Sequence, residues 1–257
     1  MTTVGIVFRP QHPLDRLRAT AEAAERSGVD ELWLWEDCFD HGGVATTAAA
    51  LAWTDRLRVG IGVLPVPLRN PALAAMEITT LARLFPDRVH AGLGHGVLEW
   101  MGQVGARAES PMTLLREYLG ALRSLLDGDE VTAAGRYVHL SGVRLGWPSP
   151  GLPLHVAATR PKTVALAGEL GDGVILTSSR TPDEIREAVE IFRTARAGRP
   201  GRVTAYLLAE GEADALAPSI ARLVESGVDA VVLEPAAAAD PVAFARLAGE
   251  QVRPLLG

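Results

Sequence analysis

A short pattern that ends a helix and leads directly into a strand occurs three times in this chain. It reads Gly28-Val29-Asp30, Gly171-Asp172-Gly173 and Gly227-Val228-Asp229. Glycine is the residue that most often ends a helix, so each copy marks the same junction in a repeated strand–helix unit. The apolar runs between helices number eight, and eight units in 257 residues are about 32 residues each. A closed (β/α)8 barrel of about 250 residues has this size.

We therefore predict an α/β fold, a single (β/α)8 barrel over residues 1–257. The strands are expected at residues 4–8, 31–35, 59–63, 89–93, 154–158, 173–177, 203–209 and 230–233. At about 129–153 the pattern degrades into short β-like pieces (136–140 and 143–145) and a Pro-rich loop, which we interpret as an excursion from the barrel and not as a domain boundary. An open doubly wound sheet is the alternative. It is disfavoured because no glycine-rich dinucleotide signature follows the first strand.

Several helix starts carry clear signals. Asn70-Pro71 and Asp240-Pro241 each place a capping side chain before a proline at the first helical position, and Ser110-Pro111 starts another helix with such a proline. Residues 181–184, Thr-Pro-Asp-Glu, add a capping box. Helices are expected at residues 13–27, 71–84, 97–104, 111–127, 161–170, 182–197 and 214–226, with a last one from 241.

The charge and the cysteine content exclude some classes of partner. The net charge is -6, and the 25 Lys and Arg residues are scattered and form no basic stripe, which argues against a nucleic-acid partner. Cys38 is the one cysteine, so no intrachain disulfide can form and nothing indicates an oxidising compartment. No run approaches about 18 uninterrupted apolar residues, and no signal-peptide core begins the sequence. We expect a cytoplasmic protein without a membrane partner.

The predicted active site lies where the third and fourth strands end. Residues 58–96 read as strand, Pro-rich turn, helix, strand and a Gly-X-Gly-His-Gly loop. In alternating strand–helix folds ligands bind beyond the carboxyl ends of the strands, so the loops at 63–71 and 94–100 are expected to face one mouth. Gly60 and Gly62 would let a flat ligand approach the backbone closely.

Three ionisable side chains are candidates for proton transfer at this mouth. Glu36 and Asp37 follow the second strand, and His95 lies between two glycines after the fourth. A carboxyl group or a neutral imidazole there would handle a proton near neutral pH. The alternative is structural: Asp37 caps the loop backbone, Glu36 is a solvated charge and His95 bonds a loop carbonyl. The sequence leaves both interpretations open.

The loop after the fifth strand combines features that suit a phosphate group. It offers backbone N–H groups at a helix start, hydroxyl groups and two cations. An ordinary helix start with surface cations is the alternative. The polar loop after the sixth strand would complete the site, as late loops of barrel enzymes often do. The candidate residues are Ala158, Thr159, Arg160, Pro161, Lys162 and Thr163 in the first loop and Thr177 and Ser178 in the second.

Other catalytic devices are missing from the sequence. The six histidines form no His-x-His or HExxH pair and there is no Cys cluster, so no metal site is predicted. No Gly-x-Ser-x-Gly motif marks a nucleophile. The chemistry is therefore expected to belong to a bound organic cofactor.

Four segments, in this order and spacing, resemble the luciferase-like monooxygenase superfamily, in particular its branch using reduced FMN or the deazaflavin coenzyme F420. They are LWLWED at 32–37, GIGV at 60–63 with RNP at 69–71, GLGHG at 92–96, and VAATRPK at 156–162 with AGELGDGV at 167–174. Two departures stand out. Related deazaflavin enzymes commonly show Gly-Gly-Pro or Gln-Gly-Pro where this chain has Thr159-Arg160-Pro161, and many relatives carry Asp-His where it has Glu36-Asp37.

The resemblance implies a (β/α)8 barrel that binds coenzyme F420 or FMN. The cofactor ring would lie against a non-prolyl cis peptide at Gly62-Val63, beside Leu64, Gly94 and His95, and the phosphate would sit on residues 159–163 with help from Thr177 and Ser178. The implied function is hydride transfer between F420 and a small organic substrate, with His95, Glu36 or Asp37 handling the proton. Alternatives are an FMN-dependent monooxygenase using reduced flavin and oxygen, and a non-catalytic flavin-binding barrel.

The substrate itself does not follow from the sequence. Trp35, Trp53, Trp100 and Met101 are candidate pocket residues, although aromatic residues at strand ends more often serve packing. The resemblance also implies a homodimer, and it leaves room for a separate flavin or F420 reductase as a partner.

Overall fold

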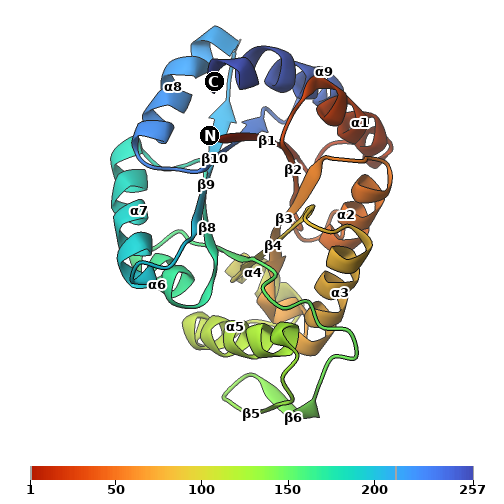
Figure 1. The fold of residues 1–257 in the computed structure, drawn as a ribbon, viewed down its shortest axis with the longest axis vertical. Coiled ribbons are helices and arrows are strands. Elements are labelled where there is room, and N and C mark those ends of the chain that lie inside the picture. The colour runs from red at the N-terminus through yellow and green to blue at the C-terminus, as the bar shows by residue number, and fades with distance from the viewer. Residues whose placement is uncertain (1, 212, 257) are drawn as a thin grey trace.

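The chain folds into a closed barrel of parallel strands with helices around its outside (Figure 1). The structure, a computed structural model, describes residues 2–211 and 213–256. The strands follow one another around the barrel in the order β1-β10-β9-β8-β7-β4-β3-β2, which confirms the predicted (β/α)8 barrel. Their bounds are β1 Thr3–Phe8, β2 Glu31–Leu34, β3 Arg58–Pro65, β4 Val89–Gly94, β7 Leu154–Ala157, β8 Gly173–Leu176, β9 Arg202–Ala209 and β10 Ala230–Pro235.

The predicted caps fix where helices begin. The Asn70 side chain accepts a hydrogen bond from the Ala72 backbone, and Thr181 forms its capping box with Glu184. The helices are α1 Leu17–Ser27, α2 Gly43–Ala52, α3 Pro71–Leu84, α4 Leu98–Gln103, α5 Pro111–Asp127, α6 Pro161–Leu170, α7 Pro182–Arg196, α8 Ala213–Glu225 and α9 Pro241–Leu247. Across the described ranges, none of them combines the length and apolarity that crossing a bilayer requires.

Three parts of the prediction need correction. Helix α2 was not predicted, because its alanines and threonines form no apolar stripe. The β-like pieces are misplaced: the observed hairpin pairs β5 (Val131–Ala134) with β6 (His139–Val143) and lies outside the barrel beyond α5 (Figure 1). Strand β10 continues to Pro235, two residues past its predicted end.

The barrel interior is polar at its base, where the strands begin. Glu31, the first residue of β2, is completely buried and accepts hydrogen bonds from Thr3, Arg202 and the Trp33 indole, the last at 3.0 Å. His90 Nε2 lies 3.6 Å from the same carboxylate. Burial alone would raise the pKa of Glu31, but His90, Arg202 and Trp33 outweigh it and hold that pKa well below its usual range.

His155 completes this base layer and is a contrasting case. Its ring packs edge-on against His90, with centroids 5.2 Å apart, and against Trp33. It is 2% exposed, and no residue in the ranges 2–211 and 213–256 forms a hydrogen bond with either ring nitrogen. Burial, with Arg202 and His90 nearby, lowers the pKa of His155 to about 3, so the ring is held neutral.

Candidate active site

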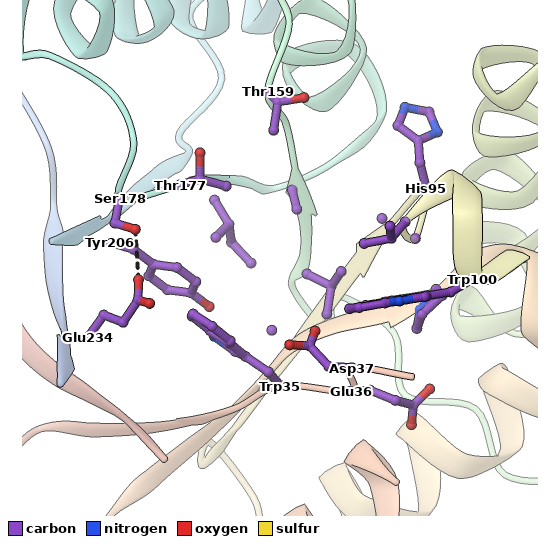
Figure 2. Close-up of a pocket in the computed structure, with 18 residues that line it drawn as sticks. Trp35, Glu36, Asp37, His95, Trp100, Thr159, Thr177, Ser178, Tyr206 and Glu234 are labelled. Atoms are coloured by element: carbon purple, nitrogen blue, oxygen red, sulfur yellow. Dashed lines mark hydrogen bonds between the residues drawn. The ribbon is translucent and has the colours of Figure 1, made fainter. Parts of the chain in front are cut away.

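A cavity of about 380 Å³ opens at the carboxyl ends of the strands, where the sequence predicts the active site. This volume lies in the range of small-molecule sites, roughly 300 to 1,000 Å³. Figure 2 shows its two sides: Thr159, Thr177 and His95 lie at one, and Trp35, Asp37 and Trp100 at the other. The predicted residues that line the cavity are Glu36, Asp37, Gly62, Val63, Gly94, His95, Thr159, Thr177 and Ser178.

The remaining predicted residues do not line the cavity. Leu64 and Ala158 are each 1% exposed and pack in the core, because neighbouring residues of a strand point to opposite faces. Arg160, Pro161 and Lys162 are exposed at the start of α6, and Thr163 is buried behind His95. The cavity itself is therefore lined by hydroxyl groups at this end and not by the predicted cations.

Tyr206 and Glu234 line the cavity but were not predicted. Tyr206 lies inside β9, and Glu234 lies in β10, just beyond the predicted end of that strand. The signal for Glu234 was a carboxylate at the end of an otherwise apolar strand. Of the candidate pocket residues, Trp35 and Trp100 line the cavity, whereas Trp53 packs under Arg18 and Met101 is buried.

The Glu36 carboxylate is fully engaged with the protein. Arg69 holds both of its oxygens, and the Gly43 backbone N–H donates to it at 2.6 Å. In Figure 2 it points away from the cavity. These contacts fasten the loop after β2 to the starts of α2 and α3, so Glu36 positions its neighbour Asp37.

Asp37 is the carboxylate that faces the cavity (Figure 2). Within the described residues its side chain has no ion-pair or hydrogen-bond partner. Burial raises the pKa of Asp37, and the charges of Asp40 and Glu234 add to that effect while Arg9 opposes it. A half-buried carboxyl group with a raised pKa is suited to take a proton from a ligand and return it.

His95 turns toward the start of α6. Its Nε2 lies 3.4 Å from the Thr163 hydroxyl, and burial lowers its pKa, so the ring is neutral at pH 7. In Figure 2 the ring lies on the side of Thr159, away from Asp37. This placement suits a hydrogen bond to a ligand's polar end better than proton exchange with Asp37.

The cavity wall contains two buried polar atoms for which the described residues supply no hydrogen-bond partner. The rings of Trp35 and Tyr206 stack with centroids 5.7 Å apart, and neither Trp35 Nε1 nor Tyr206 Oη has a partner among the described residues. Buried polar groups normally have partners, so a planar ligand with ring nitrogens and carbonyl oxygens would suit this wall. The peptide bond between Gly62 and Val63 is cis, as the resemblance implies.

Gly62 of β3 and Gly94 of β4 line the cavity, but they also make room for side chains. A Cβ on Gly62 would collide with the Tyr206 hydroxyl, and one on Gly94 would come within 2.7 Å of Val63. The two strands pair with Pro65 opposite Gly94, so their ends lie together as predicted. The glycines therefore shape the cavity wall, and the ligand space lies in front of Tyr206 and Val63.

Glu234 ties the last strand to the first. Its carboxylate accepts from Arg9 at 3.0 Å and from the Ser178 hydroxyl at 2.7 Å. The Arg9 guanidinium also donates to the Pro235 carbonyl and lies 5.9 Å from the centre of the Trp35 ring. On this side of the cavity the charge of Glu234 is thus neutralised by Arg9, and hydrogen bonds hold both side chains in place.

The model of the luciferase-like monooxygenase family matches residues 2–231. The chain belongs to this family. It is 32% identical to a 5,10-methylenetetrahydromethanopterin reductase of Methanolobus tindarius over 93% of this chain and 77% of that protein. It is also 34% identical to an F420-dependent glucose-6-phosphate dehydrogenase of Mycobacterium tuberculosis, over 62% of this chain and 52% of that protein. The chain thus spans about half the length of that second relative.

Solved structures of other proteins share the fold across nearly the whole chain. An F420-dependent secondary alcohol dehydrogenase in complex with an F420-acetone adduct superposes with a TM-score of 0.91 at 19% identity, covering 100% of this chain and 99% of that one. A monooxygenase from Streptomyces bottropensis gives a TM-score of 0.87 at 18% identity, covering 99% and 100%. At such identities the likeness shows the fold alone, because one barrel hosts many chemistries.

Proposed function

We propose that this family member is an F420-dependent oxidoreductase acting on a small organic substrate. The observation that carries the proposal is a cavity in which Asp37 faces an aromatic wall, two polar atoms of which have no partner in the part of the chain that the structure describes. Relatives above 30% identity support F420 as the cofactor, because one group of them is named for it. A bound deazaflavin supplies a hydride donor or acceptor.

The chain's own residues have separable tasks in this proposal. Trp35, Tyr206 and Val63 would hold the cofactor ring, and Thr159 and Thr177 would receive its phosphate end beside the start of α6. Asp37 holds the proton that the substrate gains or loses, and Glu36 keeps the Asp37 loop in place. The apolar wall excludes water from the reacting atoms.

Binding of the two cofactors separates the proposal from its main alternative. F420 and FMN are titrated into the purified protein, and saturable quenching of F420 fluorescence without an FMN response is expected. Tight FMN binding without F420 binding would instead favour the monooxygenase. Cofactor binding with no F420 turnover on a panel of alcohols, amines and sugar phosphates would favour the non-catalytic barrel.

Lys162 gives a second readout that does not depend on activity. It is the only lysine in the sequence, and it lies exposed at the start of α6. If the phosphate end binds there, F420 should protect Lys162 from an amine-reactive acetylating reagent, as peptide mass spectrometry would show. Lys162→Gln should weaken F420 binding about 2- to 5-fold, in line with the loss of one exposed charge contact. Equal labelling with and without F420 would place the phosphate elsewhere.

The outer face of α3 favours the predicted homodimer. Leu73, Met76 and Leu84 lie on one side of this helix and are 47%, 59% and 66% exposed. Clustered exposed apolar side chains typically mark an association surface. Light scattering on the wild type and on Met76→Glu tests this, and a monomeric wild type would refute it. A separate reductase and a location in the cytoplasm stay predictions.

A further inference from the structure

Within the described part of the chain, Asp37 is the one cavity carboxylate that forms no ion pair. Glu36 is paired with Arg69 and Glu234 with Arg9. Among the described residues that line the cavity there is no lysine or arginine. The cavity beside Asp37 therefore carries a negative potential, which attracts cations and repels anions.

Trp100 offers an aromatic face on the same side of the cavity. Four of the five tryptophans have a ring or a guanidinium packed on them: His90 on Trp33, Tyr206 and Arg9 on Trp35, Arg18 on Trp53, and Arg83 on Trp147. Across residues 2–211 and 213–256, Trp100 has no such partner, although it lines the cavity. An indole face without a partner is the strongest of the aromatic surfaces for a cation.

We propose that the substrate presents a positively charged nitrogen, an amine or an iminium group, to Asp37 and Trp100, and that anionic substrates are rejected. This inference rests on the proposed function and names its substrate class. A phosphorylated or carboxylated substrate would be repelled by the negative charge of Asp37, because no cation among the described lining residues offsets that charge. The cavity therefore discriminates between substrates by repelling anions as well as by attracting cations. The chain would then differ in substrate charge from its relatives named for glucose 6-phosphate.

A matched series of small probes tests the charge preference. Cyclohexylamine, cyclohexanol and cyclohexanecarboxylate share one ring and differ in head-group charge at pH 7.5. Each is titrated calorimetrically into the F420-saturated protein. The amine should bind at least about tenfold more tightly than the alcohol, as expected of a hydrogen bond to a charged group. The carboxylate should bind more weakly than the alcohol.

Variants assign the preference to the two residues. Asp37→Asn should reduce the amine-to-alcohol affinity ratio to about one, and Asp37→Glu should retain most of the ratio. Trp100→Leu should weaken amine binding about 2- to 5-fold, the value of an exposed cation–π contact. Glu99→Gln is the matched control, because this exposed carboxylate on α4 does not line the cavity.

Three results would overturn the inference: no amine binding to the F420-saturated protein, carboxylate binding as tight as that of the amine, or an amine preference that survives in Asp37→Asn. The first two need only the wild type, so they do not depend on a variant that folds. Failure to bind F420 in the preceding titration overturns the proposed function instead. Any of the three results in a protein that binds F420 overturns this inference alone.

Discussion

One carboxylate begins strand β2 and another lies three residues beyond its end, and their surroundings differ in the partners that each side chain has. Glu31 begins the strand at the base of the barrel, completely buried and held by Thr3, Trp33 and Arg202. Asp37 follows the strand at the mouth without a partner within the described residues. The first has a lowered pKa and the second a raised one. Burial acts on both, so the partners decide which carboxylate supports the barrel and which is free to act on a ligand.

The largest expected effect is on stability at the base. Glu31→Gln leaves Arg202 without its counter-charge and should lower the free energy of unfolding by about 3 to 5 kcal/mol. Asp37→Asn breaks no contact and should change it far less. Urea unfolding of both variants at pH 7 measures the difference. If Asp37→Asn lost as much unfolding free energy as Glu31→Gln, the contrast between a structural and a free carboxylate would be wrong.

His155 should make the base sensitive to moderate acid. Its pKa is lowered from about 6.5 to about 3. Between these two pH values His155 is therefore protonated in the unfolded chain but neutral in the folded protein. The free energy of unfolding should therefore fall as the pH drops from about 6.5 toward 3. His155→Phe removes two unpartnered nitrogens and should flatten this slope in urea titrations between pH 7 and 5. An unchanged slope would show that His155 is not the group responsible.

Asp37 should give a smaller effect of opposite sign. Because its folded pKa is raised, the stability it contributes is present below its unfolded pKa of about 3.9 and is lost as the pH rises through the folded value. The charges that act on it are Arg9, Asp40 and Glu234. Asp37→Asn should therefore gain stability relative to the wild type between pH 4 and 8. A difference in unfolding free energy between Asp37→Asn and the wild type that shrinks as the pH rises over this range would contradict the raised pKa.

The fold could be predicted because its signals are local. A cap such as Asn70 or Thr181 satisfies the first N–H groups of its own helix, so a few adjacent residues determine the start. Helix α2 was not predicted because small residues are spread around all its sides. Packing against its neighbours stabilises it, and not an apolar stripe.

The site could be predicted only in part because its partners are distant in sequence. Asp37 and His95 follow strand ends, which places them at the mouth. That Glu36 is committed to Arg69, 33 residues away, appears only when β2 and β3 lie side by side. Tyr206 and Glu234 lie within strands that otherwise look like core, and it is barrel closure that turns them toward the ligand space.

The bond between Arg9 and Glu234 joins residues 225 positions apart, at the seam where β1 meets β10. One wall of the cavity is thus built by the first and last strands together. During synthesis on the ribosome this wall is completed only after β10 has emerged and paired with β1. A newly made chain can therefore bind its ligand only at the end of folding, and ligand binding indicates that the barrel has closed.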